Sequence, residues 1–139
     1  MDTATTHPTR PSTVHHVLPP GPQAARAARE LAARMVATHD GHCPYGTADD
    51  ILLIVSELAS NAVRHGRPPY RLTLGMEAGR ASIAVGDASP ALPRHRAGHG
   101  PLSCGGRGLE IIRALGAEIF VDPSPRGKQV IAVITWPTP

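Results

Sequence analysis

Two neighbouring stretches with a period of two constrain the fold of this chain more than any other feature. Residues 70–77 and 81–87 both alternate apolar and polar side chains, so each would place its apolar row on one face of a β-strand. The members of the two rows are Leu72, Leu74, Met76, Ile83 and Val85. The residues between the stretches, at 78–80, include Gly79 and predict a hairpin turn. The segment therefore predicts an antiparallel strand pair with one face against a core.

Helical spacing recurs in three other segments, where apolar side chains return every three or four residues. These segments are residues 22–39, 49–66 and 106–115. A Thr-Ala-Asp-Asp sequence at 47–50 predicts a capping box at the start of the second helix, and Gly66 predicts its end. Further short strands are expected at residues 15–18, 119–121 and 130–135, with a turn over 122–127.

The order of these elements indicates the fold class. Strands joined by hairpins, with helices inserted, predict an α+β two-layer sandwich whose mainly antiparallel mixed sheet carries helices on one face. A doubly wound parallel fold would require regular alternation of strands and helices, which the sequence lacks. The 139 residues suit one domain, expected at 14–137. Residues 1–13, rich in Thr, Pro and Ser, are expected to form a loose tail.

Composition limits the classes of function. The chain has 14 Lys and Arg against 11 Asp and Glu, scattered without a long run of one sign. Aromatic residues make up only 3%, which leaves few surfaces on which nucleic-acid bases could stack. A basic nucleic-acid-binding domain, which would show salt-sensitive DNA affinity, is therefore the least favoured interpretation. Without a signal core or an apolar run near the ~20 residues of a membrane span, the expected location is the cytoplasm and no membrane contact is expected.

Polar residues interrupt the apolar run of the second helix. Glu57, Asn61 and His65 are spaced four residues apart, so they would project from one edge of the helix. A carboxylate and an amide one turn apart suit Mg²⁺ or the orientation of a hydroxyl group. The alternative is that Glu57 pairs with Arg64 or Arg67 on a solvated face and that Asn61 is merely tolerated.

Two further segments contain candidate ligand-binding residues. Asp87 ends an inward-facing strand, where an acid can accept a hydrogen bond from the amino group of a ring; the alternative is a turn-forming Asp. Residues 104–109, Cys-Gly-Gly-Arg-Gly-Leu, enter a helix, and glycines there leave backbone N–H groups open to a phosphate. Neither GxxxxGK[ST] nor GxGxxG is present, because Ile111 stands where the last glycine of the second motif would be.

Cysteine and histidine residues offer a weaker signal. Cys43 and Cys104 are expected to be free thiols, since nothing directs the chain to an oxidising compartment. His39, His42 and Cys43 in one loop, or His95 and His99 in another, could contribute zinc ligands. No further motif completes a four-ligand site, so zinc binding is not favoured.

Three segments in order resemble the N, G1 and G2 boxes of the Bergerat-type ATPases. They are residues 57–66, 85–90 and 105–109. That superfamily includes gyrase, heat-shock chaperones, histidine kinases and mismatch-repair ATPases. The chain length and the short region after Asp87 are most similar to its anti-sigma-factor branch, the RsbW-like serine/threonine protein kinases of actinobacterial type.

The resemblance implies a role for each matching residue. Glu57 would be the catalytic carboxylate, Asn61 the Mg²⁺ ligand and Asp87 the acid that binds the adenine amino group. The remaining nucleotide-binding residues would be Ser89, Gly106, Arg107 and Gly108. Residues 91–104 would form the lid, and the implied cofactors are ATP and Mg²⁺.

Departures from the family pattern concern two positions. Ser89 stands where the G1 box often has glycine, a variant associated with the anti-sigma branch. Gln129 stands where many relatives have a threonine near the adenine. The chain also lacks a phosphoacceptor helix and a transducer domain, so neither a complete sensor kinase nor a gyrase-like enzyme is expected.

The resemblance thus implies an ATP-binding anti-sigma factor with serine/threonine kinase activity. It would phosphorylate a STAS-type antagonist, sequester a sigma factor when that antagonist is phosphorylated, and form a homodimer. The alternative is a nucleotide-gated protein-binding module without significant kinase activity. Glu57 favours the enzyme, since phosphoryl transfer depends on positioning and charge neutralisation, whereas Gln129 favours the binding module.

Overall fold

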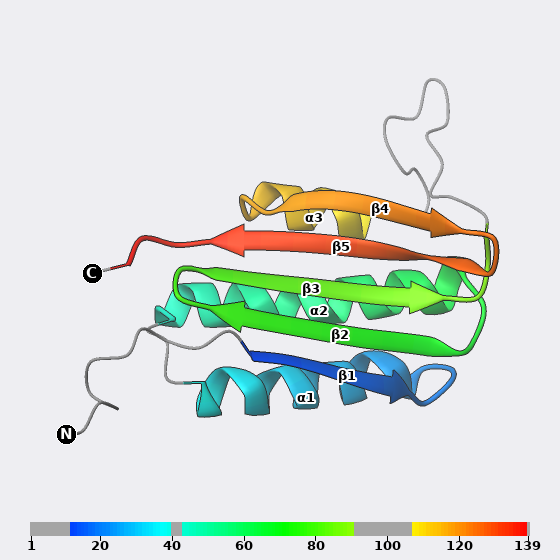
Figure 1. Cartoon of the computed structure of the whole chain (residues 1–139), viewed down its shortest axis with the longest axis horizontal. Coiled ribbons are helices and arrows are strands. Elements are labelled where there is room, and N and C mark those ends of the chain that lie inside the picture. The colour runs from blue at the N-terminus through cyan, green and yellow to red at the C-terminus, as the bar shows by residue number, and fades with distance from the viewer. Residues whose placement is uncertain (1–11, 40–42, 91–106, 139) are drawn as a thin grey trace.

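The computed structural model of the chain describes residues 12–39, 43–90 and 107–138. Within them, a five-stranded sheet of order β1-β2-β3-β5-β4 carries helices on one face (Figure 1). The elements are β1 (Ser12–Leu18), α1 (Gln23–Thr38), α2 (Tyr45–His65), β2 (Tyr70–Glu77), β3 (Arg80–Asp87), α3 (Arg107–Ala114), β4 (Glu118–Ser124) and β5 (Gly127–Thr135). The predicted α+β sandwich is confirmed, and every pairing between these strands is antiparallel.

The central hairpin of β2 and β3 forms as the alternation predicts. Leu72 lies opposite Val85, and Leu74 lies opposite Ile83. All four side chains are buried beneath the helices, because residues directly opposite each other in a sheet project to the same face. Arg80 already pairs with Glu77, so the turn is shorter than predicted, and Gly79 at φ +77° supplies its left-handed residue.

Proline residues set two boundaries that differ from the prediction. The capping box is wrong: α2 begins at Tyr45, directly after Pro44, and no side chain caps it. The Ala48 N–H instead donates to the Pro44 carbonyl at 2.9 Å, which places Thr47 inside the helix. The turn predicted over 122–127 forms but is shorter, because β4 continues through Pro123 to Ser124 and β5 begins at Gly127. An edge strand tolerates proline, since the missing N–H would face solvent.

The core lies between the sheet and the helices. α1 turns small side chains towards its neighbours, and α2 and α3 contribute larger ones. The buried apolar residues include Ala24, Ala28, Ala32 and Met35 of α1, Ile51, Ile54, Val55 and Leu58 of α2, and Leu109 and Ile112 of α3. None of the helices in the part of the chain that the structure describes is long and apolar enough to span a bilayer.

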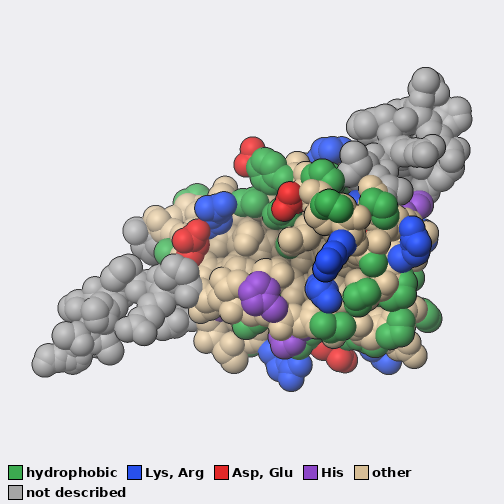
Figure 2. All heavy atoms as spheres, turned by 45° about the vertical axis from the view of Figure 1, so that its right-hand side comes forward, with side chains coloured by type: hydrophobic (Ala, Val, Ile, Leu, Met, Phe, Trp, Pro, Cys, Tyr) green, Lys and Arg blue, Asp and Glu red, His purple; other side chains and the backbone are tan. Residues whose placement is uncertain are grey.

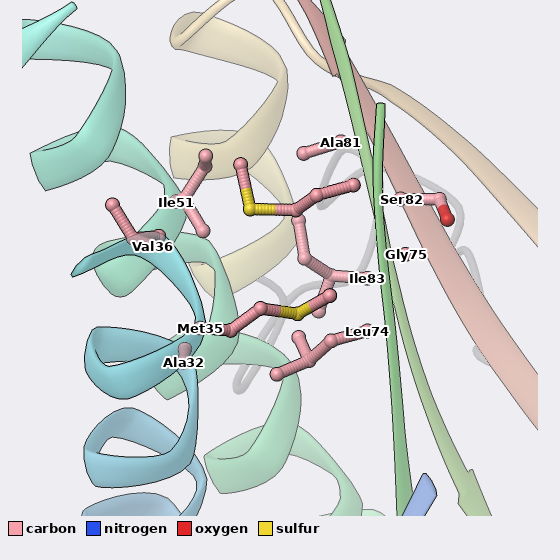
Figure 3. Close-up of a pocket in the computed structure, with 10 residues that line it drawn as sticks. Ala32, Met35, Val36, Ile51, Leu74, Gly75, Ala81, Ser82 and Ile83 are labelled. Atoms are coloured by element: carbon pink, nitrogen blue, oxygen red, sulfur yellow. The ribbon is translucent and has the colours of Figure 1, made fainter. Parts of the chain in front are cut away.

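A small apolar cavity remains where α1, α2 and the central hairpin meet (Figure 3). Met35 reaches across from α1 towards Leu74 and Ile83 of the sheet, and about 10 Å³ is left unfilled. An apolar space of this size is a packing gap and is not a binding site for a polar ligand.

Truncating the core side chain Ile83 is expected to destabilise the fold. Ile83 is 1% exposed and lines the cavity, so Ile83→Ala enlarges a space that the surroundings already leave unfilled. We expect a loss of about 2–5 kcal/mol in the free energy of unfolding, measured by urea denaturation. Leu53→Ala, at a position of α2 that is 38% exposed, is the control and should change little. Equal losses for the two variants would contradict this packing.

Candidate functional site

The end of α2 and the end of β3 meet, and this brings two of the predicted segments together. A side chain added at Gly66, which follows α2, would collide with the Asp87 carboxyl group. The Arg67 N–H lies 3.4 Å from Asp87 Oδ1, and the Arg67 carbonyl accepts from the Ala88 N–H at 2.7 Å. Gly66 therefore has a structural reason to be glycine that the sequence did not reveal.

Asp87 is a turn-forming residue as well as a buried one. Its Oδ1 accepts a hydrogen bond from the Ser89 N–H at 2.7 Å, two residues along the chain, as in an Asx turn. Ser89 is itself buried. The alternative that Asp87 is a turn-forming residue thus agrees with the observed geometry. The turn fixes the direction of the carboxylate beside α2.

Lys128 is a site residue that sequence reasoning missed. It lies directly opposite Asp87 in the β3–β5 pairing, so both side chains face the helical layer. Lys128 Nζ lies 2.9 Å from Asp87 Oδ2 and 3.3 Å from Oδ1, and the two side chains are only 4% and 2% exposed. The ammonium also donates to the Ser89 carbonyl at 3.4 Å. The inward-facing residues of β5 are spaced two apart, and the position two residues before Val130 is Lys128. This alternation was the signal that could have identified the lysine.

Gln129, by contrast, does not face Asp87. It lies opposite Gly86, and a side chain on Gly86 would meet Gln129 Cγ at 3.4 Å. Gln129 is exposed and projects from the helix-free face of the sheet. The side chain of β5 on the Asp87 side is that of Lys128.

The polar edge of α2 approaches the start of α3. A side chain added at Gly108 would lie 2.8 Å from Glu57 Oε1. Asn61 is buried at 7% exposure, Glu57 is half-buried and His65 is exposed. Two ion pairs are found among the described residues, one between Arg80 and Glu77 and one between Lys128 and Asp87. Within that part of the chain, the alternative pairing of Glu57 with Arg64 or Arg67 is therefore not found.

Asn61 offers the donor chemistry that a hard cation requires. Its amide is buried, and its side chain makes no hydrogen bond with any other residue in 12–39, 43–90 or 107–138. Carboxamide oxygens are among the ligands that Mg²⁺ accepts alongside phosphate oxygens. The side chain therefore has the chemistry of a ligand for a hard cation such as Mg²⁺.

Other predicted positions lie outside the described residues. These are Gly106, the lid at 91–104, His42, His95, His99 and Cys104. Arg107 begins α3. No group of three or more metal-binding side chains occurs among the residues that are described.

Cys43 is a free thiol, as predicted. It packs against the edge of the core, and burial raises the pKa of this thiol. Because the thiolate is the reactive form, the raised pKa makes Cys43 less reactive near neutral pH.

A separate hollow of about 770 Å³ lies where β3 and β4 end and where β2 and β5 begin. Arg71, Thr73, Asp122 and Gln129 line it from the helix-free face, together with Asp87 and Lys128 at its edge. Glu57, Asn61 and Gly108 do not line this hollow, so it is not the space in which the predicted residues converge. On the face shown in Figure 2, Lys and Arg side chains are scattered among hydrophobic ones, which gives no continuous basic track.

The sequence profile of the histidine kinase-like ATPase domain matches residues 18–134. No functionally curated protein matches the chain.

Solved structures share the fold. The RsbU and RsbW domains of Rv1364c from Mycobacterium tuberculosis match with a TM-score of 0.63 and 20% identity, over 91% of this chain and 34% of that one. The histidine kinase domain of the blue-light activated histidine kinase EL346 from Erythrobacter litoralis matches with a TM-score of 0.55 and 24% identity, over 81% of this chain and 58% of that one. The chain thus spans about a third of the first structure and somewhat over half of the second.

Proposed function

Because the chain belongs to the family of histidine kinase-like ATPase domains, we propose that it binds ATP where α2, β3 and α3 meet. One observation carries this proposal. Three segments far apart in sequence converge, with Gly66 against the Asp87 carboxylate and Gly108 against Glu57. Glycine at both contacts lets the backbone approach closely, as a nucleotide site between these elements would require.

Each site residue has a proposed role. Asp87 would accept a hydrogen bond from the adenine amino group. Asn61 would bind Mg²⁺, which supplies charge neutralisation at the phosphates. The backbone N–H groups at the start of α3 would bind phosphate oxygens, because the N-terminus of a helix favours anions. The residues assigned to this phosphate and loop region are Ser89, Gly106, Arg107 and Gly108.

We further propose that the bound ATP serves protein phosphorylation. Glu57 would orient or deprotonate a serine or threonine hydroxyl of the acceptor, since it is a half-buried carboxylate beside the phosphate-binding helix. The resemblance of residues 57–66, 85–90 and 105–109 to the RsbW-like kinases favours an anti-sigma factor that would phosphorylate a STAS-type antagonist in the cytoplasm and work as a homodimer. The RsbW domain of Rv1364c shares the fold.

Nucleotide binding is tested by calorimetric titration with ATP and Mg²⁺. Asp87→Asn should weaken ATP binding about tenfold or more, because a hydrogen bond to a charged acceptor is lost. Asn61→Ala should weaken binding only when Mg²⁺ is present. Asp122→Asn, which removes an exposed carboxylate of β4, is the matched control and should bind as the wild type does. Circular dichroism verifies that each variant is folded. A wild type without ATP affinity would refute the proposed function.

Phosphoryl transfer is tested with Glu57→Gln. We expect transfer from ATP to a STAS-type protein of the same organism to fall by about 10²–10⁴-fold, because the general base is lost, while ATP affinity stays within about twofold. Glu110→Gln removes an exposed carboxylate of α3 and should leave transfer unchanged. No transfer by the wild type, despite ATP binding, would instead favour the nucleotide-gated binding module.

A further inference from the structure

The buried lysine beside Asp87 has no part in the roles assigned above. Lys128 contributes a charge to the interior, where a structural ion pair is often no better than apolar packing of the same volume. It is also the only lysine of the chain. Its position at the proposed base-binding end of the site therefore calls for a function other than stability.

The hydrogen bonds of the pair are unevenly distributed. Asp87 Oδ1 receives the Ser89 N–H at 2.7 Å and, more weakly, the Arg67 N–H at 3.4 Å. Among the described residues, the one polar partner of Oδ2 is Lys128 Nζ, at 2.9 Å, and the Gly66 backbone packs beside it. A carboxylate oxygen has two lone pairs, so Oδ2 can accept one more hydrogen bond.

The Lys128 ammonium can donate a hydrogen bond to a ligand in place of one of its weaker contacts. An ammonium carries three N–H groups, and only the 2.9 Å bond to Oδ2 has a favourable length. The contacts to Asp87 Oδ1 and to the Ser89 carbonyl, at 3.3 and 3.4 Å, are long. Because the Asp87 side chain is only 2% exposed, a base can reach it only when groups that cover the carboxylate shift, and the Lys128 ammonium is one of these groups.

Adenine presents the complementary pattern. Its exocyclic amino group is a donor, and each flanking ring nitrogen, N1 or N7, is an acceptor. On the basis of the proposed ATP site, we propose that Lys128 is a second residue that recognises the base. Its ammonium donates to the ring nitrogen beside the amino group, while Asp87 Oδ2 accepts from the amino group.

The backbone holds this donor and acceptor in place. Gly127 packs directly against the Asp87 carbonyl, so the residue before Lys128 is fixed to the end of β3. Gly66 closes the other side of the carboxylate. A donor and an acceptor held side by side in this way can distinguish bases by the loss of a single ring nitrogen.

The test is calorimetric titration of the wild type and Lys128→Met with ATP, 1-deaza-ATP and 7-deaza-ATP. One analogue should bind the wild type about tenfold more weakly than ATP, and this difference should shrink to less than about twofold in Lys128→Met. Any change in ring stacking affects both proteins alike and cancels in the comparison. Arg126→Met removes an exposed cation of the same hairpin and should keep the wild-type preference.

A measurement on the wild type alone covers the case in which Lys128→Met does not fold. Labelling with [¹⁵Nζ]lysine gives one side-chain ammonium signal, because the chain has one lysine. ATP should shift this signal, and the weaker analogue should shift it much less at saturation. Equal shifts with all three nucleotides, equal affinities for all three, or full discrimination by Lys128→Met would overturn the role of Lys128.

The outcomes separate this inference from the proposed function. A wild type that binds none of the three nucleotides refutes the ATP site, and the role of Lys128 falls with it. ATP binding that depends on Asp87 but ignores both ring nitrogens overturns the role of Lys128 alone.

Discussion

Replacing Gly127 with alanine is expected to cost at least about 3 kcal/mol of folding free energy, a large part of the ~5–15 kcal/mol typical of a domain. Gly127 adopts φ +156°, a region open almost only to glycine. A Cβ there would collide with the Asp87 carbonyl oxygen and lie 3.1 Å from Ala88 Cα. Both contacts are with backbone atoms, so the collision can be relieved only if β3 and β5 move apart. Urea denaturation measures the loss.

Two other glycines serve as controls for Gly127→Ala. Gly116 also has a positive φ, +89°, but no atom lies within 4 Å of its added Cβ. Gly116→Ala should therefore cost only the conformational strain, about 1–2 kcal/mol. Gly46 lies in α2 with open space around it, and Gly46→Ala should be neutral or stabilising by up to about 1 kcal/mol. If Gly127→Ala cost no more than Gly116→Ala, the close approach to Asp87 would be refuted.

Removing the charge of Lys128 is the second change with a large expected effect. Lys128→Met leaves the Asp87 carboxylate buried without its cation, and we expect a loss of about 3–5 kcal/mol in the free energy of unfolding. The double variant Lys128→Met/Asp87→Asn removes both charges and should recover most of that loss. The comparison forms a double-mutant cycle, which isolates the coupling between the two side chains.

The exposed ion pair on the central hairpin provides the control for this cycle. Arg80 and Glu77 are 3.5 Å apart, with side chains 54% and 44% exposed. Solvent screens such a pair, so Arg80→Met should change stability by less than about 1 kcal/mol. A Lys128→Met/Asp87→Asn variant as unstable as Lys128→Met would show that the loss comes from the methionine and not from the unpaired carboxylate.

Local periodicity was enough to predict most of the fold. The alternation at 70–77 and 81–87 specified both the central hairpin and its buried face, since a shift of one residue would have exposed the apolar row. Helix positions followed from the spacing of their apolar residues. The start of α2 could not be predicted in the same way, because Pro44 and the capping sequence that follows it offered two competing start signals.

The site was predictable only in part. Glu57, Asn61 and Asp87 stand out because they are polar residues in apolar surroundings. Lys128 lies between the turn predicted at 122–127 and the strand predicted at 130–135, so the pattern placed it in neither element, and its pairing with Asp87 joins residues 41 positions apart. The close contacts at Gly66 and Gly108 depend on how α2 and α3 pack, which local sequence does not encode.

The sheet order also has a consequence for how the protein folds. β2 and β3 form one hairpin and β4 and β5 another, while the pairing of β3 with β5 joins the two. Hairpins close short loops and can form early, whereas their union must close a long one at a greater entropic cost. Asp87 belongs to the first hairpin and Lys128 to the second. The buried pair is therefore complete only when the two halves of the sheet have docked, and we expect a ligand of this pair to slow unfolding without accelerating folding.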